Sequence, residues 1–356
     1  MLGVLVCVIA TLAQQSAPRI QDKSEKSDDQ GSTIRVDTDL ILLDVSVKGS
    51  DGRSIAGLRK EDFEILEDGV KQQVALFSTS DVPLNIVLIL DTSGSTEKDV
   101  SLMRRAAKRF LEEIRPKDRV ALVAFSQTVQ LLSNFSADRN RLDHALGEME
   151  PGSGTALYDT LVVSLNDLFR RVEGRKALVI LTDGVDSFGQ STFGQVVPLV
   201  DKSRATLYFL ELDSEKETLA RLLLDCENDK HFKLSRKQMR KYGEHYEKAN
   251  VWWRDADYCA LSADQRRLLT EKLYELAHDE LTELADRSGG RVYPVAGNNE
   301  ISGIFSQIAA ELRTLYSIGY YSTNDKRDGK WRALQVAVVG KNITAMTKPG
   351  YRAPMD

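Results

Sequence analysis

Four short, almost uninterrupted apolar segments constrain the fold of this 356-residue chain more than any other feature. They are residues 86–90, 120–125, 177–181 and 207–212. Continuous apolarity is typical of β-strands in a parallel sheet that is covered on both faces. Helical patterns of apolar residues separate the segments, and this alternation predicts an α/β fold with a doubly wound, mostly parallel sheet and helices on both faces.

Composition narrows the class of protein and of partner. Hydrophobic residues make up 42% of the chain and charged residues 28%, close to the averages of soluble globular proteins. A wholly disordered chain is therefore excluded. The net charge of -5 is a small difference between 48 basic and 53 acidic residues, so we expect no nucleic-acid partner.

The first residues predict an exported protein. Residues 2–13 form an apolar run that is shorter than the ~20 residues of a membrane span but typical of the core of a signal peptide. We expect residues 1–13 to be removed and the mature chain, without a membrane span, to be periplasmic, secreted or associated with the cell envelope. Residues 14–32 are polar and lack periodicity, which predicts a disordered linker.

Both ends of the remaining chain predict antiparallel strands. Residues 43–47 and 334–338 alternate apolar with polar side chains, the pattern of a half-buried strand. Residues 63–67 and 70–77 flank an Asp-Gly pair that is typical of a tight hairpin turn. We therefore expect residues 33–80 to form an N-terminal β module and residues 318–356 to pair with it, which makes one small antiparallel β domain from both chain ends.

Polar residues follow two of the apolar segments. Asp91, Ser93 and Ser95 come directly after the first segment, Asp183 follows the third, and Thr155 lies in a glycine-rich loop before a predicted helix. Ligands of open α/β sheets bind outside the carboxyl ends of the strands. Carboxylate and hydroxyl oxygens suit Mg²⁺, which keeps part of its shell as water. These five residues therefore predict a Mg²⁺ site, with Mn²⁺ as an alternative, whose cation stays electrophilic toward a further oxygen.

This set of five residues, in this order, resembles the metal-ion-dependent adhesion site of von Willebrand factor type A domains. Such domains occur in integrins, many bacterial surface proteins and metal chelatases. The resemblance covers residues 81–317, and all five positions are filled. It implies a Rossmann-like von Willebrand A domain, an intact metal site, and a protein ligand that presents an Asp or Glu carboxylate to the cation.

The flanking segments are similar to a narrower group, the secreted von Willebrand A proteins known mainly from acidobacteria. The similarity rests on residues 58–68, 317–321 and 348–352. It extends over nearly the whole chain. Since the biochemical role of that group is largely undefined, this resemblance supports the fold and the metal site more than a biological role.

Residues 213–262 form an insertion where type A domains usually have a short connection. Ser262 and Gln265 are spaced as in a capping box, which predicts that a helix begins there and that the insertion is at least partly helical. Trp252 and Trp253 lie near its centre. They fit either a surface that contacts a partner or, as we favour, a small core of the insertion itself.

The cysteines of the mature chain also fall in the insertion. With Cys7 removed, Cys226 and Cys259 remain, and an oxidising compartment favours a disulfide between them. His231 and His245 complete a Cys₂His₂ inventory, but the spacings do not match those of structural zinc sites.

Three functions stay open from the sequence. A binding module for an acidic side chain of a protein partner is favoured, and the chain is then not an enzyme. A metal-assisted hydrolase is the enzyme alternative, but no histidine lies near Asp91, Thr155 or Asp183 in sequence as a general base. In the third reading the type A domain is a scaffold, and the insertion or the β domain binds the partner.

Overall fold

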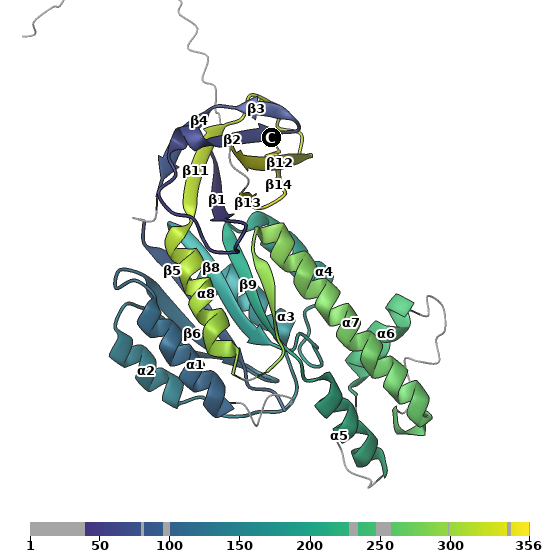
Figure 1. Cartoon of the computed structure of the whole chain (residues 1–356). Coiled ribbons are helices and arrows are strands. Elements are labelled where there is room, and N and C mark those ends of the chain that lie inside the picture. Colours follow the sequence, from purple (N-terminus) through teal and green to yellow (C-terminus); the bar gives the residue numbers. More distant parts are fainter. Residues whose placement is uncertain are drawn as a thin grey trace, which may run out of the picture. The chain divides into compact units, whose positions relative to one another are not determined.

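The computed structural model (Figure 1) describes most of the chain from residue 40 onward. The described ranges are 40–79, 82–94, 100–227, 234–246, 258–297, 299–339 and 343–355. All of them belong to one compact unit, Thr38–Asp356. The predicted signal peptide and linker lie outside the described residues, as do Ser95, His231 and the Trp252-Trp253 pair.

A six-stranded sheet forms the core of this unit. In spatial order its strands are β10 (Arg291–Val295), β9 (Ala205–Leu212), β8 (Arg175–Thr182), β5 (Leu84–Asp91), β6 (Arg119–Phe125) and β7 (Val129–Ser136). All neighbouring pairs are parallel except β6 and β7. The four predicted apolar segments form the four inner strands. The mostly parallel sheet is thus confirmed.

The two edge strands were not predicted because neither has the apolar run of an inner strand. In β7 only Ser133 is buried, and the five-residue β10 contains an exposed proline, Pro294. Both strands are recognisable only from their pairing with a neighbour. Antiparallel β7 closes one edge of the sheet, and β10 closes the other.

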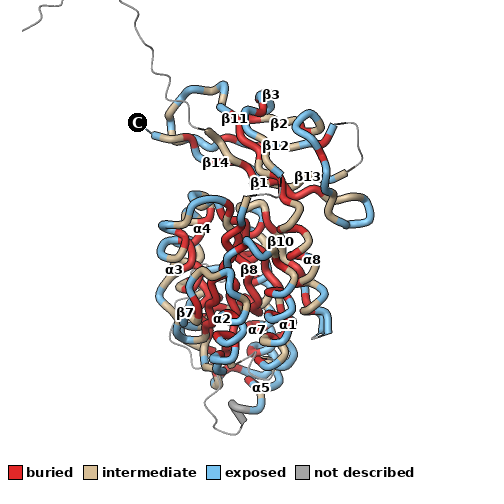
Figure 2. Tube along the Cα trace, turned by 90° about the vertical axis from the view of Figure 1, so that its left-hand side faces the viewer, coloured by how far each residue is buried: buried red, intermediate tan, exposed pale blue. Residues whose placement is uncertain are grey.

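Helices cover both faces of the sheet (Figure 1). One face carries α1 (Val100–Glu113), α2 (Arg139–Gly147) and α8 (Ile301–Thr314), and the other carries α3 (Leu157–Val163), a π-helical turn at residues 164–168, α4 (Phe193–Lys202) and α7 (Ala263–Ser288). In β5, Ile86 and Leu88 pack in the first layer, whereas Val87 and Ile89 pack in the second. This burial from both faces explains why the central residues of the inner strands are apolar, and Figure 2 shows the buried residues of the sheet in red.

Two four-stranded antiparallel sheets form the second part of the unit. One has the order β13 (Thr344–Met346), β1 (Leu40–Lys48), β11 (Tyr316–Tyr321), β4 (Val74–Ser78), and the other has the order β14 (Gly350–Arg352), β12 (Trp331–Val338), β2 (Phe63–Glu67), β3 (Val70–Gln72). Each sheet combines strands from both chain ends, and in the first sheet they alternate. The predicted β domain built from both ends is therefore present, with an apolar core between its strands.

The predicted hairpin at residues 63–77 is correct at its turn and wrong in its second strand. Asp68 and Gly69 both have positive φ, 48° and 80°, as a two-residue hairpin turn requires. The second strand, however, divides after Gln72 into β3, which pairs with β2, and β4, which pairs with β11 in the other sheet. A period-two pattern does not show at which residue a strand leaves one sheet for another.

A buried ionic cluster connects the last helix of the core to the β domain. Glu311 of α8 is 2% exposed and forms an ion pair with Lys48 of β1, with 2.6 Å between Oε2 and Nζ. The hydroxyl groups of Tyr208 and Tyr293 also donate to this carboxylate, at 3.1 and 3.0 Å. The core sheet, α8 and the β domain therefore share one buried carboxylate.

The predicted insertion is helical where it is described. It contains α5 (Glu215–Glu227), α6 (Arg236–Tyr246) and a short 3₁₀ turn at Tyr258–Ala260. The Ser262 hydroxyl caps α7 by accepting from the amide of Gln265, and the side-chain oxygen of Gln265 accepts from the amide of Ser262, so the predicted capping box is confirmed. These elements enclose a small apolar core of their own, which includes Leu222, Met239, Tyr242, Tyr258 and Leu269.

The structure describes the side chain of one of the two cysteines in the predicted disulfide. Cys259 is disulfide-bonded and half-buried at the edge of this small core. The side chain of Cys226 lies outside the description. The pairing of these two residues therefore stays a prediction.

Candidate functional site

The candidate site lies at the carboxyl ends of two adjacent parallel strands. Asp91 is the last residue of β5, and Asp183 directly follows Thr182, the last residue of β8. Leu90 and Leu181 are opposite each other in the ladder between these strands. The fold therefore places the two predicted carboxylates at the same edge of the sheet.

The carboxylate of Asp91 is fully buried and held on both oxygens. Its Oδ2 accepts a hydrogen bond from the hydroxyl of Thr182 at 2.6 Å, and its Oδ1 accepts one from the amide of Ser93 at 2.9 Å. Burial, and then the nearby charge of Asp183, raise the pKa of Asp91 to about 7. Two neighbouring carboxylates with little access to solvent repel each other, and a bound cation would reduce this repulsion.

Asp183 is held by neutral donors. Its Oδ2 accepts from the hydroxyl of Ser214 at 2.7 Å, and its Oδ1 accepts from the amide of Val185 at 3.2 Å. In the described part of the chain, neither lysine nor arginine forms an ion pair with this buried carboxylate. The hydroxyl of Tyr274 lies 2.8 Å from that of Ser214 and extends the polar chain into α7.

Thr155 reaches the same place from the third loop. Its carbonyl oxygen accepts from the amides of Ser187 and Phe188 at 2.9 and 2.8 Å, which fixes the loop against the segment after β8. The glycine at 152 is required here, since a Cβ atom would lie 2.3 Å from the hydroxyl oxygen of Ser126. The Thr155 hydroxyl itself makes no hydrogen bond to any described residue, although Thr155 is only 4% exposed.

The structure thus brings together four of the five predicted ligands. Asp91, Ser93, Thr155 and Asp183 all lie at this edge, and Ser95 lies outside the described residues. Within the described ranges, no three His, Cys, Asp or Glu side chains are grouped so that they could hold a metal ion. A cation bound here would depend on hydroxyl ligands together with the two carboxylates, and the residues present fit that donor set.

A pocket of about 290 Å³ opens over this edge. The three loops contribute Gly94, Thr155 and Asp183, and the insertion contributes Thr218, Arg221, Leu222, Leu234 and Gln238. Arg221 of α5 also donates to the carbonyl oxygen of Gly94 at 3.2 Å. The insertion is therefore part of the wall of the candidate site.

Sequence reasoning missed Thr182, Ser214 and Tyr274 as partners of the two carboxylates. A usable signal existed for Ser214, because it follows β9, whose carboxyl end lies at the same edge as those of β5 and β8. Tyr274 carried no such signal. Its place depends on the packing of α7, and burial, with the charge of Asp183, raises its pKa.

Two lysines of α6 fasten the insertion beside the pocket. Lys237 forms an ion pair with the fully buried carboxylate of Asp186 and donates to the carbonyl oxygen of Phe188 at 2.7 Å. Lys241 pairs with Glu280 of α7 and donates to the hydroxyl of Tyr158 at 2.8 Å. Burial raises the pKa of Asp186 to about 6, although Lys237 opposes that shift.

The Lys237→Met variant is expected to loosen α6. Amide hydrogen exchange of residues 236–246 should become about 10-fold faster or more, because a hydrogen bond to a charged group contributes ~1.5–3 kcal/mol and 1.4 kcal/mol is a factor of ten. Arg240→Met is the matched control, since Arg240 is exposed on the same helix. Equal exchange rates in both variants would show that Lys237 does not hold the helix in place.

Comparison with known families identifies the core. Residues 86–185, under a third of the chain, match the family model of the von Willebrand factor type A domain. The match begins in β5 and ends just after β8, so it includes the three loops of the candidate site. Together with the order of the core strands it shows the von Willebrand A fold. The narrower acidobacterial resemblance and the intact metal site remain predictions.

A curated relative and several solved structures are similar over parts of the chain. An uncharacterized protein of Borreliella burgdorferi is 24% identical over 143 residues, 37% of this chain and 42% of that protein, so the chain spans less than half of this relative. The vWF domain of the type V pili tip protein Mfa5 from Porphyromonas gingivalis is 23% identical, with 30% of this chain and 39% of that chain covered and a TM-score of 0.27. A von Willebrand factor type A protein from Catenulispora acidiphila is 12% identical, with 89% and 74% covered and a TM-score of 0.43. Among the described helices, none has the length and apolarity to cross a membrane.

Proposed function

We propose that this protein is an exported binding module that captures a carboxylate of a protein partner through a divalent cation. Asp91, Ser93, Ser95, Thr155 and Asp183 would hold the cation, with Mg²⁺ as the expected ion and Mn²⁺ as an alternative. One observation carries the proposal: Asp183 and Thr155, whose hydroxyl has no hydrogen-bond partner among the described residues, line one pocket, and the buried carboxylate of Asp91 lies close enough to Asp183 for the two charges to interact. Von Willebrand factor type A domains, moreover, often mediate protein–protein interaction or adhesion.

The chain's own residues would orient the ligands and limit access to them. Thr182 and Ser214 fix the two carboxylates by hydrogen bonds, so that little reorganisation is required on binding. The insertion narrows the approach, because α5 and α6 contribute to the wall of the pocket. When bound, the cation supplies Lewis acidity toward an incoming carboxylate oxygen.

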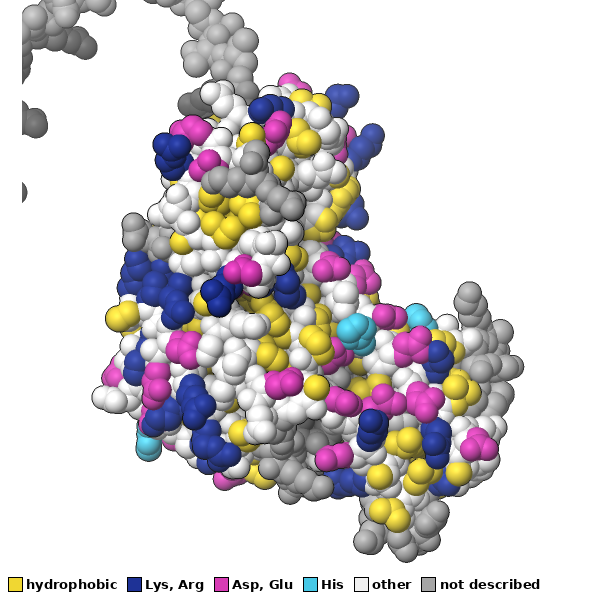
Figure 3. All heavy atoms as spheres, in the orientation of Figure 1, with side chains coloured by type: hydrophobic (Ala, Val, Ile, Leu, Met, Phe, Trp, Pro, Cys, Tyr) yellow, Lys and Arg dark blue, Asp and Glu magenta, His cyan; other side chains and the backbone are white. Residues whose placement is uncertain are grey.

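The lining of the pocket supports binding more than hydrolysis. The described residues around it carry hydroxyl, amide and guanidinium groups and the carboxylate of Asp183, which the proposed cation would engage, and no histidine among them could act as a general base. On the face shown in Figure 3, basic and acidic side chains are interspersed rather than separated. A single acidic side chain recognised at one site fits this surface better than a long charged partner. The signal-peptide pattern of residues 1–13 supports a place in the periplasm, the cell envelope or the medium.

Binding of a set of soluble peptides to the immobilised protein tests the proposed function. Each peptide presents one central Asp or Glu, and a matched peptide presents Asn or Gln instead. Binding is expected with Mg²⁺, and it should be lost with a chelator, with the amide peptides and in the Asp91→Ala variant. Asp143→Ala is the control, because Asp143 is exposed on α2. Equal capture in the presence of the chelator would contradict a metal-dependent site.

A further inference from the structure

A second cavity lies at the opposite ends of the core strands. It has a volume of about 450 Å³, within the ~300–1,000 Å³ typical of sites for small molecules. Its walls come from the amino-terminal ends of β8 and β9 and from β1, β4 and β11 of the β domain. Arg175, the first residue of β8, lines this cavity, whereas the candidate metal site follows the last residue of the same strand. We refer to it as the junction cavity.

Arg175 is the outstanding feature of the junction cavity. The residue is 5% exposed, and none of its three guanidinium nitrogen atoms has a hydrogen-bond partner among the described residues. The carboxylate paired with it is that of Asp44, 3.5 Å from Nε, and the same oxygen of Asp44 already accepts from the hydroxyl of Ser317 at 2.6 Å. Buried polar groups are nearly always hydrogen-bonded, so a guanidinium without any such bond indicates an acceptor that the described part of the chain does not supply.

The other charges of the cavity are also mainly positive. Lys348 is partly buried and Arg204 is exposed, and neither forms an ion pair within the described part of the chain. Burial, together with the charge of Arg204, lowers the pKa of Lys348. Among the described residues that line the cavity, Asp44 is the only acidic one. An anion placed among these three cations would be favoured by charge and would give Arg175 its missing acceptor.

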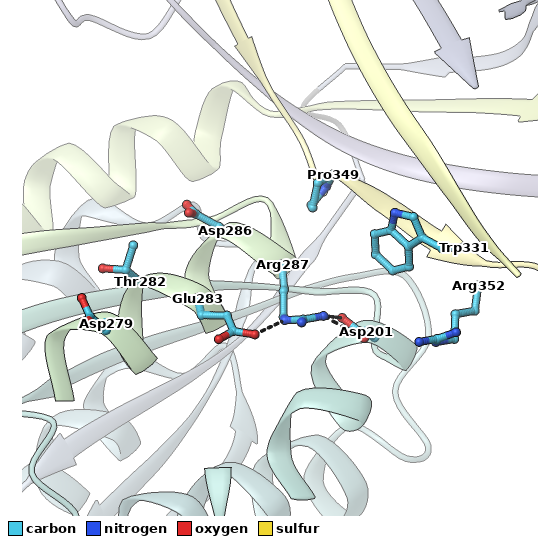
Figure 4. A pocket seen from close by; sticks show the side chains of 9 residues that line it. All are labelled: Asp201, Asp279, Thr282, Glu283, Asp286, Arg287, Trp331, Pro349 and Arg352. Atoms are coloured by element: carbon cyan, nitrogen blue, oxygen red, sulfur yellow. Dashed lines mark hydrogen bonds and ion pairs between the residues drawn. The ribbon is translucent and has the colours of Figure 1, made fainter. Parts of the chain in front are cut away.

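Arg287 also borders the cavity but is already paired. Figure 4 shows its guanidinium between Glu283 and Asp201, at 2.8 and 3.1 Å. Its charge is therefore compensated and is not counted as part of an anion site. The open cleft drawn in Figure 4 is rich in carboxylates, which distinguishes it from the cationic junction cavity.

The remaining lining combines hydroxyl groups, among them those of Ser78, Ser203 and Thr206, with apolar side chains. Leu42, Leu76, Phe77, Val82 and Val200 face the space next to the cations. A free inorganic anion would use only the charged part of such a cavity. A hydrocarbon body would remove the apolar part from water, at roughly 25 cal/mol per Å² of apolar surface.

We propose that the junction cavity binds an amphiphilic anion, a molecule with one carboxylate or phosphate group on a hydrocarbon body. Arg175 anchors the anionic group from inside, Arg204 and Lys348 attract it from the opening, and the apolar side chains hold the body. This site is independent of the metal site. It would place a small-molecule ligand between the von Willebrand A core and the β domain.

Calorimetric titration of the full protein with four ten-carbon probes tests the proposal. Decanoate and decyl phosphate are expected to bind, and the tighter of the two identifies the carboxylate or the phosphate class. Decyltrimethylammonium, which has the same body and the opposite charge, should not bind. Inorganic phosphate should bind far more weakly than decyl phosphate. The Asp183→Ala variant should bind both anions as the wild type does, which separates this site from the metal site.

Substitutions of the basic residues distinguish a specific anion-binding site from a cavity that binds hydrophobic molecules non-specifically. Arg175→Met should weaken binding of the anions about 10- to 100-fold, because a hydrogen bond to a charged group contributes ~1.5–3 kcal/mol. Should that variant fail to fold, Arg204→Met, at an exposed position, should still weaken binding several-fold, and Arg240→Met on α6 should not. The proposal is overturned if neither anion binds, if the cationic probe binds equally well, or if the cavity variants that fold keep wild-type affinity.

Discussion

Replacing Lys48 with methionine is expected to lower the free energy of unfolding at pH 7 by about 3–5 kcal/mol, the range for a buried ion pair that loses one partner. The side chains of Lys48 and Glu311 are 14% and 3% exposed, so solvent screens their interaction little. In the variant the Glu311 carboxylate keeps its two tyrosine donors but loses the only cation that pairs with it among the described residues. Urea unfolding followed by circular dichroism measures the loss.

The pH dependence of the same variant has a definite sign. Burial alone would raise the pKa of Glu311, but in the wild type Lys48, together with smaller contributions from Ser46 and Arg291, outweighs that effect and the pKa is lowered. The pair therefore contributes stability above the pKa of the unfolded state, and this contribution is lost as the pH falls through the lower folded pKa. The difference between wild type and variant should accordingly be largest at neutral pH and should shrink toward about pH 4 and below.

A double variant separates the lost pair from a lost packing contact. Lys48→Met combined with Glu311→Gln removes the uncompensated charge but keeps an acceptor for the two tyrosine hydroxyl groups. Part of the stability should return. If the double variant is as unstable as Lys48→Met alone at pH 7, the loss comes from packing of the lysine stem, and the ion pair is not what connects the core to the β domain.

The Asp183→Ala variant is expected to lose all stabilisation by Mg²⁺ and Mn²⁺. A ligand that binds only the folded state stabilises it by about 2.7 kcal/mol at a concentration 100 times its dissociation constant, so the wild type should show a clear shift in thermal unfolding. The variant removes one of the two carboxylates in the proposed donor set. In the absence of metal, the variant should be no less stable than the wild type, because the negative charge of Asp183 repels that of the buried Asp91.

Calorimetry across a metal titration distinguishes the proposed site from other cation binding. Asp143→Ala removes an exposed carboxylate on α2 and should keep the full metal response. A response that persists unchanged in Asp183→Ala would mean that the cation binds elsewhere. In that case the pocket beside α5 and α6 has to be explained without a metal.

The inner part of the fold could be predicted because its physical demands appear directly in the residues. A strand covered on both faces has to be largely apolar, and the central residues of β5, β6, β8 and β9 are. The predicted metal ligands followed from the rule that strand ends of an open sheet share one edge. Edge strands such as β7 and β10 are less completely covered, so they do not require a continuous apolar run and their sequences do not contain one.

The remaining features depend on contacts between segments that are distant in the sequence. Lys237 and Lys241 lie on a helix whose charges look solvated, yet both meet buried carboxylates. Arg175 stands at the start of a predicted strand, where a basic residue usually reaches water, and the β domain covers it instead. The local sequence around a charged residue does not indicate whether a distant segment of the chain will cover it.

The interleaving of the two chain ends also dictates an order of events during synthesis. β11 lies between β1 and β4, so these two N-terminal strands have no partner in their sheet until residues 316–321 have been made. About 240 residues separate β4 from β11, which corresponds to on the order of 10–50 s at ~5–20 residues per second. During that interval the nascent chain carries unpaired strand edges, which are prone to aggregate. The core strands and α8 are complete before the β domain can close, and a chain that stopped just before Tyr316 would leave β1 and β4 permanently open to a chaperone or to another copy.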